Sequence, residues 1–540
     1  MKLMRKIFSA DKNVSYGRTI PGGIRPRAHK ITSLRSRVMA TPIPPVLIIP
    51  LNQQQGKASR PCVKAGDRVL KYQKIAEAAD DSSLNIHAPS SGVVSMIQNH
   101  TTININAANQ LCIFIETDGI DEEVPIPDTL DWRGMTSEQL LPVISNAGIC
   151  GMGGAGFPLS KKIDSAIIPD IHTLIINAVE CEPFITADQA LIREHADEVI
   201  QGAQILQHAI NAKRCLLAIE SDKTDAIEAL SNYADRDSIK LLLLDNKYPA
   251  GGERQLIQAA TGKELPAGHL PAEAGIYVQN AGTVFSIYKA VVENKPCISR
   301  VTTLTGEALQ TPKNFNALVG TQVSWLFDLC GIDNKTHSKS VAGGSLMGIE
   351  LMDNSAPISQ STNCLIAGSL SEFPDIMPEQ ACIRCGYCAN ACPSGLLPQQ
   401  LLAYSRCEED ELLAQQGLFD CIECGACSYV CPSSIPLVQY YRSSKERIIS
   451  ARQKKETSQA WQNRFQYHQY RIKKLKDEAL SRTSAKPVID KQQSADDPFS
   501  KEQAALEVAA AVARVKAKKG NVIASSAATD GSQSDGEPTA

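Results

Sequence analysis

The chain contains 540 residues, which at roughly 150 residues per domain predicts three or four domains. Lysine and arginine number 55 and aspartate and glutamate 58, so the formal net charge is −3. This near balance excludes a protein that binds nucleic acid through overall positive charge. Hydrophobic residues make up 43% of the chain, which also excludes a fibrous or wholly disordered protein.

No segment of the sequence resembles a membrane span or a secretion signal. The most apolar run, Val46–Leu51, is interrupted by proline and is far shorter than the ~20 residues that cross a bilayer. The first eight residues lack the apolar core of a signal peptide. Of the seventeen cysteines, eight lie between Cys382 and Cys431 and the other nine are spread without a pairing pattern. A disulfide framework would be typical of a small secreted domain, so we expect a long cytoplasmic chain that does not itself cross a membrane.

The N-terminal part of the chain is predicted to contain two different segments. Residues 1–40 form an irregular lead-in. Residues 41–120 carry short β-type runs separated by glycine turns, among them Val46–Leu51, Val69–Ala76 and Gly92–Ile97. Such a series predicts a small all-β barrel.

Alternating strands and helices follow in residues 130–297 and predict an α/β domain. The expected elements are a helix at Leu140–Ala147, a strand at Thr173–Asn177, a helix at Ala187–Ile210, strands at Arg214–Glu220 and Ile239–Asp245, and helices at Thr224–Leu230 and Arg254–Ala260. Residues 298–352 return to short strands. The predicted fold class is therefore multidomain, with α/β and α+β parts.

The C-terminal part changes composition twice. Residues 370–445 are rich in cysteine and are predicted to be mostly helical. Residues 446–520 form a basic helical tail, and residues 445–480 hold ten Lys and Arg against four Asp and Glu. Residues 521–540 contain no aromatic side chain that could support a core, so we expect them to be disordered.

Two identical cysteine runs are the most specific motif in the chain. They begin at Cys382 and Cys421, and each reads C-x2-C-x2-C-x3-C-P. This spacing is typical of two-cluster bacterial ferredoxins, in which the fourth cysteine of each run binds the cluster of the other run. The predicted ligand sets of the two [4Fe–4S] clusters are Cys382, Cys385, Cys388 and Cys431, and Cys421, Cys424, Cys427 and Cys392. The alternative is a pair of zinc sites, although zinc usually takes two C-x2-C pairs or mixtures of cysteine and histidine.

A glycine-rich loop lies near the start of the α/β segment. Four glycines fall between Gly151 and Gly156, and their backbone N–H groups suit an anion. Lys161 and Lys162 follow, and either could meet a phosphate. A simple tight turn is the alternative, because the loop follows a helix-like segment instead of the strand that a dinucleotide-binding loop requires.

Polar residues follow the predicted strands of the same segment. Asn177, Glu180 and Glu182 come after one strand, Glu253 opens a helix, and Asn280-Ala-Gly-Thr283 comes after another strand. Ligands of open α/β sheets bind at the carboxyl ends of the strands. Together these residues predict a binding pocket.

The same residues resemble a known family. The glycine loop, Asn177-Ala-Val-Glu-Cys-Glu-Pro183, the turn at Glu253 and the segment Asn280-x-x-Thr283 resemble, in order, the flavin-carrying, NADH-oxidising subunit of respiratory complex I. With the cysteine doublet and with Gly22–Lys30 at the front, about residues 15–445 resemble the RnfC family, the C subunits of the Rnf/Rsx-type ion-translocating oxidoreductases.

The resemblance implies sites for FMN and for NADH as substrate. The residues implied around FMN are Gly151, Gly153, Gly154, Gly156, Lys162, Asn177, Glu180, Asn280 and Thr283. Those implied nearer the nicotinamide nucleotide are Phe157, Glu182 and Glu253. The chain departs from complex I at Met152, Val179, Gly252 and Gly282, so the pocket would bind flavin with fewer polar contacts.

The resemblance extends to two flanking segments. Residues 41–120 resemble a lipoyl-type hybrid barrel, but the hairpin from Ala76 to His87 contains no lysine that could carry a swinging cofactor. A structural or docking role is therefore expected. Residues 298–352 resemble the β-grasp-like ligand-binding module that follows the flavin domain of complex I.

The implied function is that of a peripheral electron-transfer subunit. It would pass electrons between NADH, FMN and two [4Fe–4S] clusters within a membrane-bound NADH:acceptor (ferredoxin-type) oxidoreductase complex that translocates ions, without a catalytic acid, base or nucleophile of its own. The expected partners are the membrane subunits of the complex, ferredoxin or another electron carrier, and an anionic membrane surface near the basic tail. The expected location is the cytoplasmic side of the bacterial inner membrane, and no nucleic acid is expected.

Two alternative functions are compatible with the same residues. One is a non-enzymatic relay or scaffold subunit that carries two clusters and has no functional flavin site. The other is a soluble NADH or formate dehydrogenase β-type subunit, which would keep the flavin and change the partners.

Overall fold

The computed structural model describes residues 14–54, 56–103, 109–127, 131–154, 156–167, 170–231, 233, 239–375, 377–484, 505–506 and 508–512. The disorder predicted for residues 521–540 concerns residues outside these ranges. The chain divides into two compact units, Met1–Arg452 and Gln453–Ala540.

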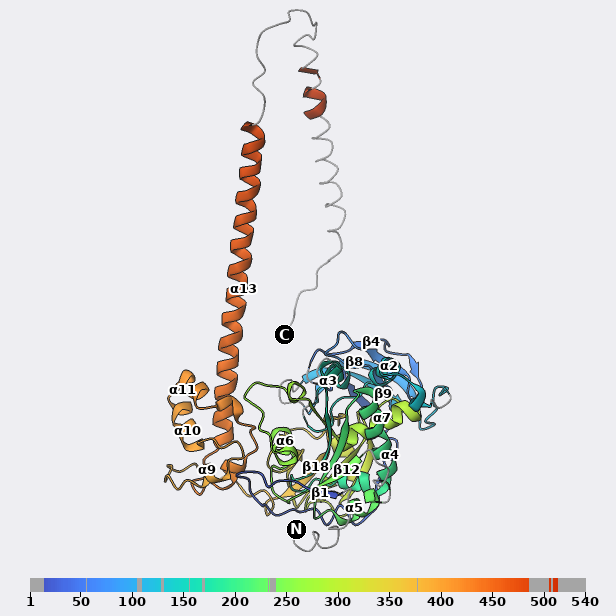
Figure 1. Cartoon of the computed structure of the whole chain (residues 1–540). Coiled ribbons are helices and arrows are strands. Elements are labelled where there is room, and N and C mark those ends of the chain that lie inside the picture. The colour runs from blue at the N-terminus through green and yellow to red at the C-terminus, as the bar shows by residue number, and fades with distance from the viewer. Residues whose placement is uncertain are drawn as a thin grey trace, which may run out of the picture. The chain divides into compact units, whose positions relative to one another are not determined.

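A five-stranded parallel sheet forms the centre of the α/β domain (Figure 1). Its strands, in spatial order, are β1 (Val14–Tyr16), β12 (Ile239–Leu244), β11 (Arg214–Glu220), β10 (Thr173–Ala178) and β13 (Ile276–Asn280). The strands read as almost continuous apolar runs because both faces of the sheet are covered. Ile176 and Leu241 pack into one core, whereas the adjacent Ile175 and Leu242 pack into another.

Helices cover both faces of this sheet. Side chains of α4 and α7 belong to the larger core, and α6 supplies Leu256 and Ile257 to the smaller one. The helical elements of the domain are η1 (Trp132–Gly134), α2 (Ser137–Asn146), α3 (Leu159–Ile167), α4 (Ala187–Ala209), α5 (Thr224–Ser231), α6 (Glu253–Thr261), η2 (Pro271–Ala274) and α7 (Ala281–Val292). This arrangement leaves the carboxyl ends of the strands as the edge at which loops and N-terminal helix ends meet.

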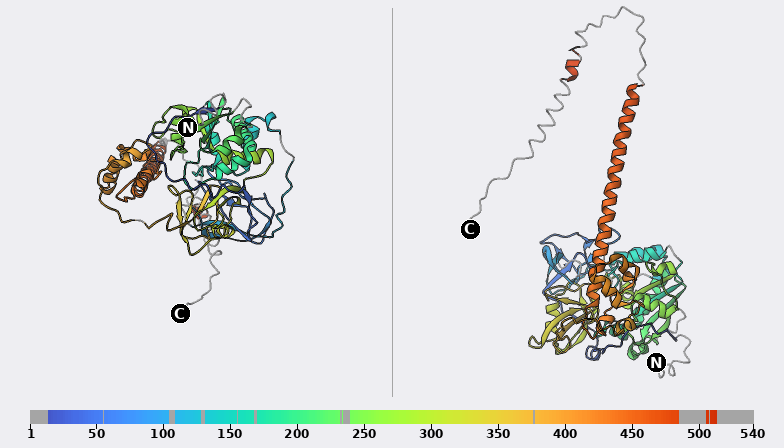
Figure 2. Two further views of the ribbon diagram at one scale, coloured as in Figure 1. Left: turned by 90° about the horizontal axis from the view of Figure 1, so that it is seen from below. Right: turned by 90° about the vertical axis from the view of Figure 1, so that its left-hand side faces the viewer.

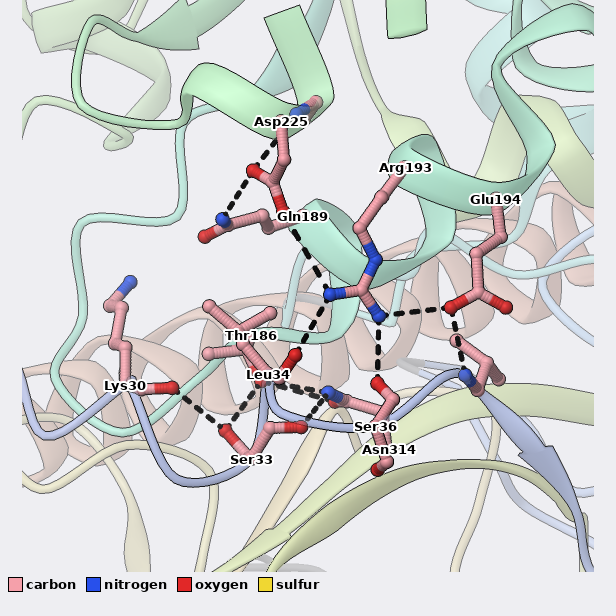
Figure 3. A network of polar contacts seen from close by, with 12 residues as sticks. Lys30, Ser33, Leu34, Ser36, Thr186, Gln189, Arg193, Glu194, Asp225 and Asn314 are labelled. Atoms are coloured by element: carbon pink, nitrogen blue, oxygen red, sulfur yellow. Dashed lines mark hydrogen bonds and ion pairs between the residues drawn. The ribbon is translucent and has the colours of Figure 1, made fainter.

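The N-terminal lead-in is not irregular throughout, so the prediction for residues 1–40 was wrong in part. Val14–Tyr16 pairs with β12 as an edge strand, and β2 (Met39–Ala40) pairs with β15 of another sheet. Between them the chain is tied down by side chains, because Arg193 of α4 donates to the carbonyls of Leu34 and Ser36 (Figure 3). Local pattern could not predict these strands, since each is short and its partner lies more than 200 residues away.

Two further sheets build a hybrid barrel. Its four-stranded sheet has the order β3-β9-β8-β5 and its three-stranded sheet the order β4-β6-β7, and both contribute to one apolar core. The strands are β3 (Val46–Pro50), β4 (Arg60–Pro61), β5 (Arg68–Val69), β6 (Lys74–Glu77), β7 (Ile86–His87), β8 (Gly92–Thr101) and β9 (Asn109–Thr117).

A six-stranded sheet follows the α/β domain. Its order is β17-β16-β18-β14-β15-β2, and α8 (Val323–Leu329) packs on it. The strands not yet given are β14 (Ser299–Thr305), β15 (Lys313–Leu318), β16 (His337–Ala342), β17 (Ile349–Leu351) and β18 (Cys364–Ser369). The loop Gly343–Gly348 joins β16 to β17.

The cysteine-rich segment is helical, as predicted, and its helices form one group, orange in Figure 2. They are α9 (Tyr387–Ala391), α10 (Pro398–Arg406), α11 (Asp410–Gln415), η3 (Leu418–Asp420), α12 (Ala426–Tyr429) and the first turns of α13 (Leu437–Ser484). Leu401, Leu413 and Tyr441 form part of their common core. Among the described residues, no helix is both long enough and apolar enough to cross a membrane.

Candidate functional site

The two cysteine runs fold into loops with the same backbone pattern. In the first, Arg384 and Gly386 have φ of 56° and 80°, and in the second Glu423 and Gly425 have φ of 57° and 76°. Left-handed residues turn the chain sharply, and glycine adopts this region without steric cost. Each loop therefore folds back around its first two cysteines before entering the short helix, α9 or α12, that carries the third.

Each loop encloses a cavity together with the fourth cysteine of the other run. The first cavity is lined by Cys382, Cys385, Cys388 and Cys431. The second cavity is lined by Cys392, Cys421, Cys424 and Cys427. The structure therefore brings together the two ligand sets that the sequence predicted. Leu402 and Ile435 line the first cavity, and Leu401 and Val438 the second.

The donor set and the cavities fit two iron–sulfur clusters. All seventeen cysteines are free, and no group of three or more His, Cys, Asp or Glu side chains among the described residues closes on a single metal ion. Four thiols around an apolar cavity instead suit a group larger than one ion, with thiolate as the ligand. Burial raises the pKa of the Cys424 and Cys427 thiols to about 12, which favours the protonated form in the metal-free chain. Binding of metal by these thiols therefore releases protons.

The glycine loop packs against the N-terminus of α7 at the carboxyl edge of the sheet. Gly151 donates its N–H to the carbonyl of Phe157 at 2.8 Å, and the Met152 N–H donates to Thr283 Oγ1 at 3.0 Å. Gly154 has φ of +100°, and an added Cβ there would meet open space. The loop is thus held at its start and free at its tip, which suits a ligand that approaches the backbone.

The predicted polar residues at the strand ends are brought together, but most of their side chains have protein partners. Asn177 donates to the Gly251 carbonyl at 2.9 Å, and Asn280 donates to Asp188 Oδ2 at 2.6 Å. The Glu180 carboxylate accepts from the N–H of Asp188 at 2.9 Å at the start of α4. These side chains shape the edge of the sheet by fixing helix ends and turns.

Lys162, which follows the glycine loop in the chain, pairs with Glu253 at the start of α6. Lys162 Nζ is 2.7 Å from the Val278 carbonyl and 3.2 Å from Glu253 Oε1. Phe157 lies below the ammonium group of Lys161, 5.8 Å from its ring centroid. Each cation therefore lies beside a residue predicted to contact the nucleotide, Lys161 beside Phe157 and Lys162 beside Glu253.

Glu182 lies apart from this group. Its Oε1 accepts from the N–H groups of Leu346 and Met347, at 2.7 and 2.9 Å, beneath the loop Gly343–Gly348. Burial raises the pKa of Glu182, and these two amides and the Tyr248 hydroxyl oppose that shift only in part.

Three groups near the loop were not predicted from the sequence. Gln279 is 4% exposed and its Oε1 has no hydrogen-bond partner, while its Nε2 lies 4.0 Å from a Cβ added at Gly151. The Gln255 Oε1 and the Tyr277 hydroxyl are also buried without a partner. An orphaned acceptor beside an open glycine loop fits a bound group that carries hydrogen-bond donors. The only sequence signal for Gln279 was its place between Val278 and Asn280 at a strand end.

Three family models match parts of this chain. Residues 18–120 match the RnfC barrel sandwich hybrid domain, residues 144–289 the Nuo51 FMN-binding domain, and residues 381–435 the 4Fe-4S dicluster domain. The glycine loop, the strand ends and Gln279 all lie within the second match, and both cysteine runs lie within the third.

Relatives that match most of the chain were also found. The chain is 42% identical over 497 residues to the C subunit of the ion-translocating oxidoreductase complex of Yersinia pestis bv. Antiqua (strain Antiqua), a match that covers 92% of this chain and 80% of that one. It is 43% identical over 454 residues to the protein of the same name from Pseudomonas aeruginosa, covering 84% and 59%. A solved NAD+-reducing [NiFe]-hydrogenase in the H2-reduced state aligns with a TM-score of 0.42 and 17% identity, over 59% of this chain and 64% of that chain.

Proposed function

This chain belongs to the family of C subunits of ion-translocating oxidoreductase complexes, and from that premise we propose which of its residues carry the electrons. It is a peripheral electron-transfer subunit whose cofactors are FMN and [4Fe–4S] clusters. The residue assignments, the partners and the location that follow are our proposals.

The two cysteine-lined cavities carry the proposal. Cys382, Cys385, Cys388 and Cys431 hold one cluster, and Cys421, Cys424, Cys427 and Cys392 hold the other. The support is that each predicted set lines one cavity and neither of these two cavities mixes the sets. Because the runs exchange their fourth cysteine, the two cavities are neighbours, which favours electron transfer between them.

We place FMN at the glycine loop. The N–H groups of Gly153, Gly154 and Gly156 are proposed to face the phosphate, and Lys162 to add positive charge. Gly151, whose N–H donates to the Phe157 carbonyl, closes the loop, while Asn177, Glu180, Asn280 and Thr283 fix the surrounding backbone. Gln279 offers its free Oε1 to a donor on the ligand. FMN, when bound, accepts two electrons as hydride from NADH and gives them up one at a time. The protein's part is to bind, orient and exclude water.

NADH is proposed to bind beside Phe157 and Glu253. Phe157 provides a flat apolar face, and Glu253 stands at the start of α6 with its side chain partly exposed. A carboxylate at such a position can accept from ribose hydroxyls. Glu182, the third residue predicted near the nucleotide, has its Oε1 engaged by two amides, which favours a different role for it.

The finer domain plan is also proposed. We assign residues 1–40 to the lead-in, 41–120 to the hybrid barrel, 130–297 to the FMN and NADH domain, 298–352 to a β-grasp-like module, 370–445 to the cluster domain and 446–520 to the basic tail. The barrel lacks a lysine between Ala76 and His87, so its proposed role is docking to other subunits.

The proposed partners are the membrane subunits of the complex and ferredoxin or another carrier, at the cytoplasmic face of the inner membrane. The basic stretch 445–480 is proposed to meet anionic lipid, at roughly 1 kcal/mol per basic residue near the surface. Binding of the full chain to phosphatidylserine vesicles should fall as salt rises. Binding that does not depend on salt would contradict the lipid contact.

An anaerobic titration with NADH tests the function. The reconstituted full chain should bind flavin and about eight irons. NADH should bleach the flavin first and then reduce the clusters. Full iron without flavin, and no response to NADH, would support the two-cluster relay. Activity in a complex without membrane subunits would support a dehydrogenase β-type subunit.

A further inference from the structure

We propose that Glu182 and Tyr248 are positioning residues for one of the two cysteine loops, the second loop at Cys421–Cys427. Together with the glycine-rich loop Gly343–Gly348, they fix this loop to the α/β domain and set the surroundings of its cluster alone. The inference rests on the proposed function, in that this loop holds a [4Fe–4S] cluster.

Glu182 holds the loop Gly343–Gly348 through hydrogen bonds. Its Oε1 accepts from the N–H groups of Leu346 and Met347, at 2.7 and 2.9 Å. Gly344 lies so close that an added Cβ would stand 1.7 Å from Glu182 Cγ. The carboxylate and the loop therefore fit each other closely, and a nucleotide could reach this oxygen only by displacing two amide donors.

The upper side of the same loop touches the second cysteine loop. A Cβ added at Gly425 would stand 3.0 Å from the Leu346 carbonyl oxygen. Leu346 also packs in an apolar cluster with Cys424, Ala426 and Tyr248. The loop Gly343–Gly348 is thus a spacer between Glu182 and the backbone that carries a cluster ligand.

Tyr248 provides the second link. This side chain is 2% exposed and its hydroxyl donates to the Cys424 carbonyl at 2.6 Å. The backbone of Tyr248 exchanges two hydrogen bonds with Ile24, and Gly23 of the same segment donates to the Ala391 carbonyl at 2.9 Å. Tyr248 therefore stands where the α/β domain, the N-terminal segment and the cluster domain meet.

The first cysteine loop has a different environment. Gly386 occupies the position of Gly425, and a Cβ added there meets nothing within 4 Å. Cys382 and Cys385 are exposed, whereas Cys424 and Cys427 are buried. Hydrogen bonds and solvent exposure set cluster potentials. The contacts of Glu182 and Tyr248 should therefore change the potential of the second cluster and not that of the first.

Redox titration followed by electron paramagnetic resonance tests the inference on the reconstituted full chain. Cys382→Ser and Cys421→Ser first assign the two signals to the two loops. Tyr248→Phe removes only a hydroxyl, so the fold is kept. We expect it to lower the midpoint potential of the second-loop cluster, on the order of tenfold in its reduction equilibrium, which is about 59 mV for one electron. The first-loop signal should not move.

Glu182→Ala releases the loop Gly343–Gly348 and should broaden or shift the signal of the second-loop cluster. Glu182→Gln keeps an acceptor oxygen, so its signal should be close to that of the unchanged chain. The dissociation constant for NADH should change less than twofold in all three variants, with Glu253→Gln as the control on the nucleotide side. A tenfold weaker NADH affinity in Glu182→Gln with unchanged potentials would make Glu182 a nucleotide contact and overturn the inference. Equal shifts of both clusters, or of neither, would also overturn it. Absence of clusters in the parent chain would instead reject the proposed function.

Discussion

The two cysteine loops share their ligand spacing and their left-handed turns, yet they lie in different surroundings. In the first loop Ile383 is 67% exposed, whereas the equivalent Ile422 packs against the buried cluster that contains Tyr248. Arg384 of the first loop is exposed, but the equivalent Glu423 is bound by Arg442 at 2.9 Å and by Lys445 at 2.8 Å. One loop is open to solvent and the other is fixed on two sides.

This difference predicts that the two clusters differ in redox potential although their ligands are equivalent. Potentials of [4Fe–4S] clusters depend on hydrogen bonds, nearby charge and exposure as well as on the thiolates. The fixed loop faces the α/β domain and suits exchange with flavin. The open loop suits exchange with a partner that must come and go.

Removing the third cysteine of each run should give the largest difference between the two loops. Cys388→Ala and Cys427→Ala should each reduce iron from about eight to about four per chain. Cys427→Ala should also lower the free energy of unfolding by about 2 kcal/mol more, because its loop supports a buried contact. Iron analysis and thermal melts of the reconstituted chains measure both effects. Equal melting temperatures of the two variants would contradict the larger contribution of the second loop to stability.

Exchanging the charged residue between the loops should give the next largest effect. Glu423→Arg places a cation beside Arg442 and Lys445 and should destabilise the chain by about 1–2 kcal/mol. Arg384→Glu, on the exposed loop, should stay within about 0.5 kcal/mol. Denaturant unfolding compares the two variants, and a cost for Arg384→Glu as large as that for Glu423→Arg would contradict the assignment of fixed and open loops.

Substitution of Ile422 or of the equivalent Ile383 should have a smaller effect on stability. Ile422→Ala should cost about 1 kcal/mol, because this partly buried side chain loses its packing against the buried cluster that contains Tyr248. Ile383→Ala should cost under about 0.5 kcal/mol and should instead slow electron delivery to a partner protein. Melting curves and stopped-flow reduction of the partner separate stability from transfer. Slower transfer in Ile422→Ala alone would assign the exit to the other loop.

The smallest expected effect is a loss of stability of the metal-free chain at acid pH. Burial alone would raise the pKa of Glu423, but hydrogen bonds from Lys445 and Arg442 outweigh it and lower this pKa below its ordinary value of 4.5. The stabilisation is therefore complete above about pH 4.5 and is lost as the pH falls through the folded-state pKa. The loss should be under about 1 kcal/mol and absent in Glu423→Gln. Melting temperatures between pH 3 and pH 6 measure it.

Much of the fold could be predicted because its signals are local. The strand Arg214–Glu220 has the predicted bounds, and α4 ends one residue from its predicted end. Apolar runs and helical periods identify such elements within a short window. The grouping of the cysteines also followed from spacing, since the exchange of the fourth ligand belongs to the motif.

What could not be predicted depends on residues far apart in the chain. Lys30 lies 7% exposed and donates to the Glu180 carbonyl, although nothing around it in the sequence marks it as buried. Glu182 was predicted to lie near a nucleotide because of its neighbours in sequence, whereas its contacts come from a loop more than 160 residues later. Its role stays a prediction until nucleotide affinity and cluster potential are measured separately.

The N-terminal segment has a consequence for biosynthesis. Residues 14–40 pair with the parallel sheet, contact Ala391 beside a cluster ligand and pair with the six-stranded sheet. The ribosome makes this segment well before its partner, because Gly23 cannot reach Ala391 until some 370 residues more have been added, roughly 20–70 s at 5–20 residues per second. The docking of this early segment is therefore completed only after the barrel, the α/β domain and the six-stranded sheet have all been made.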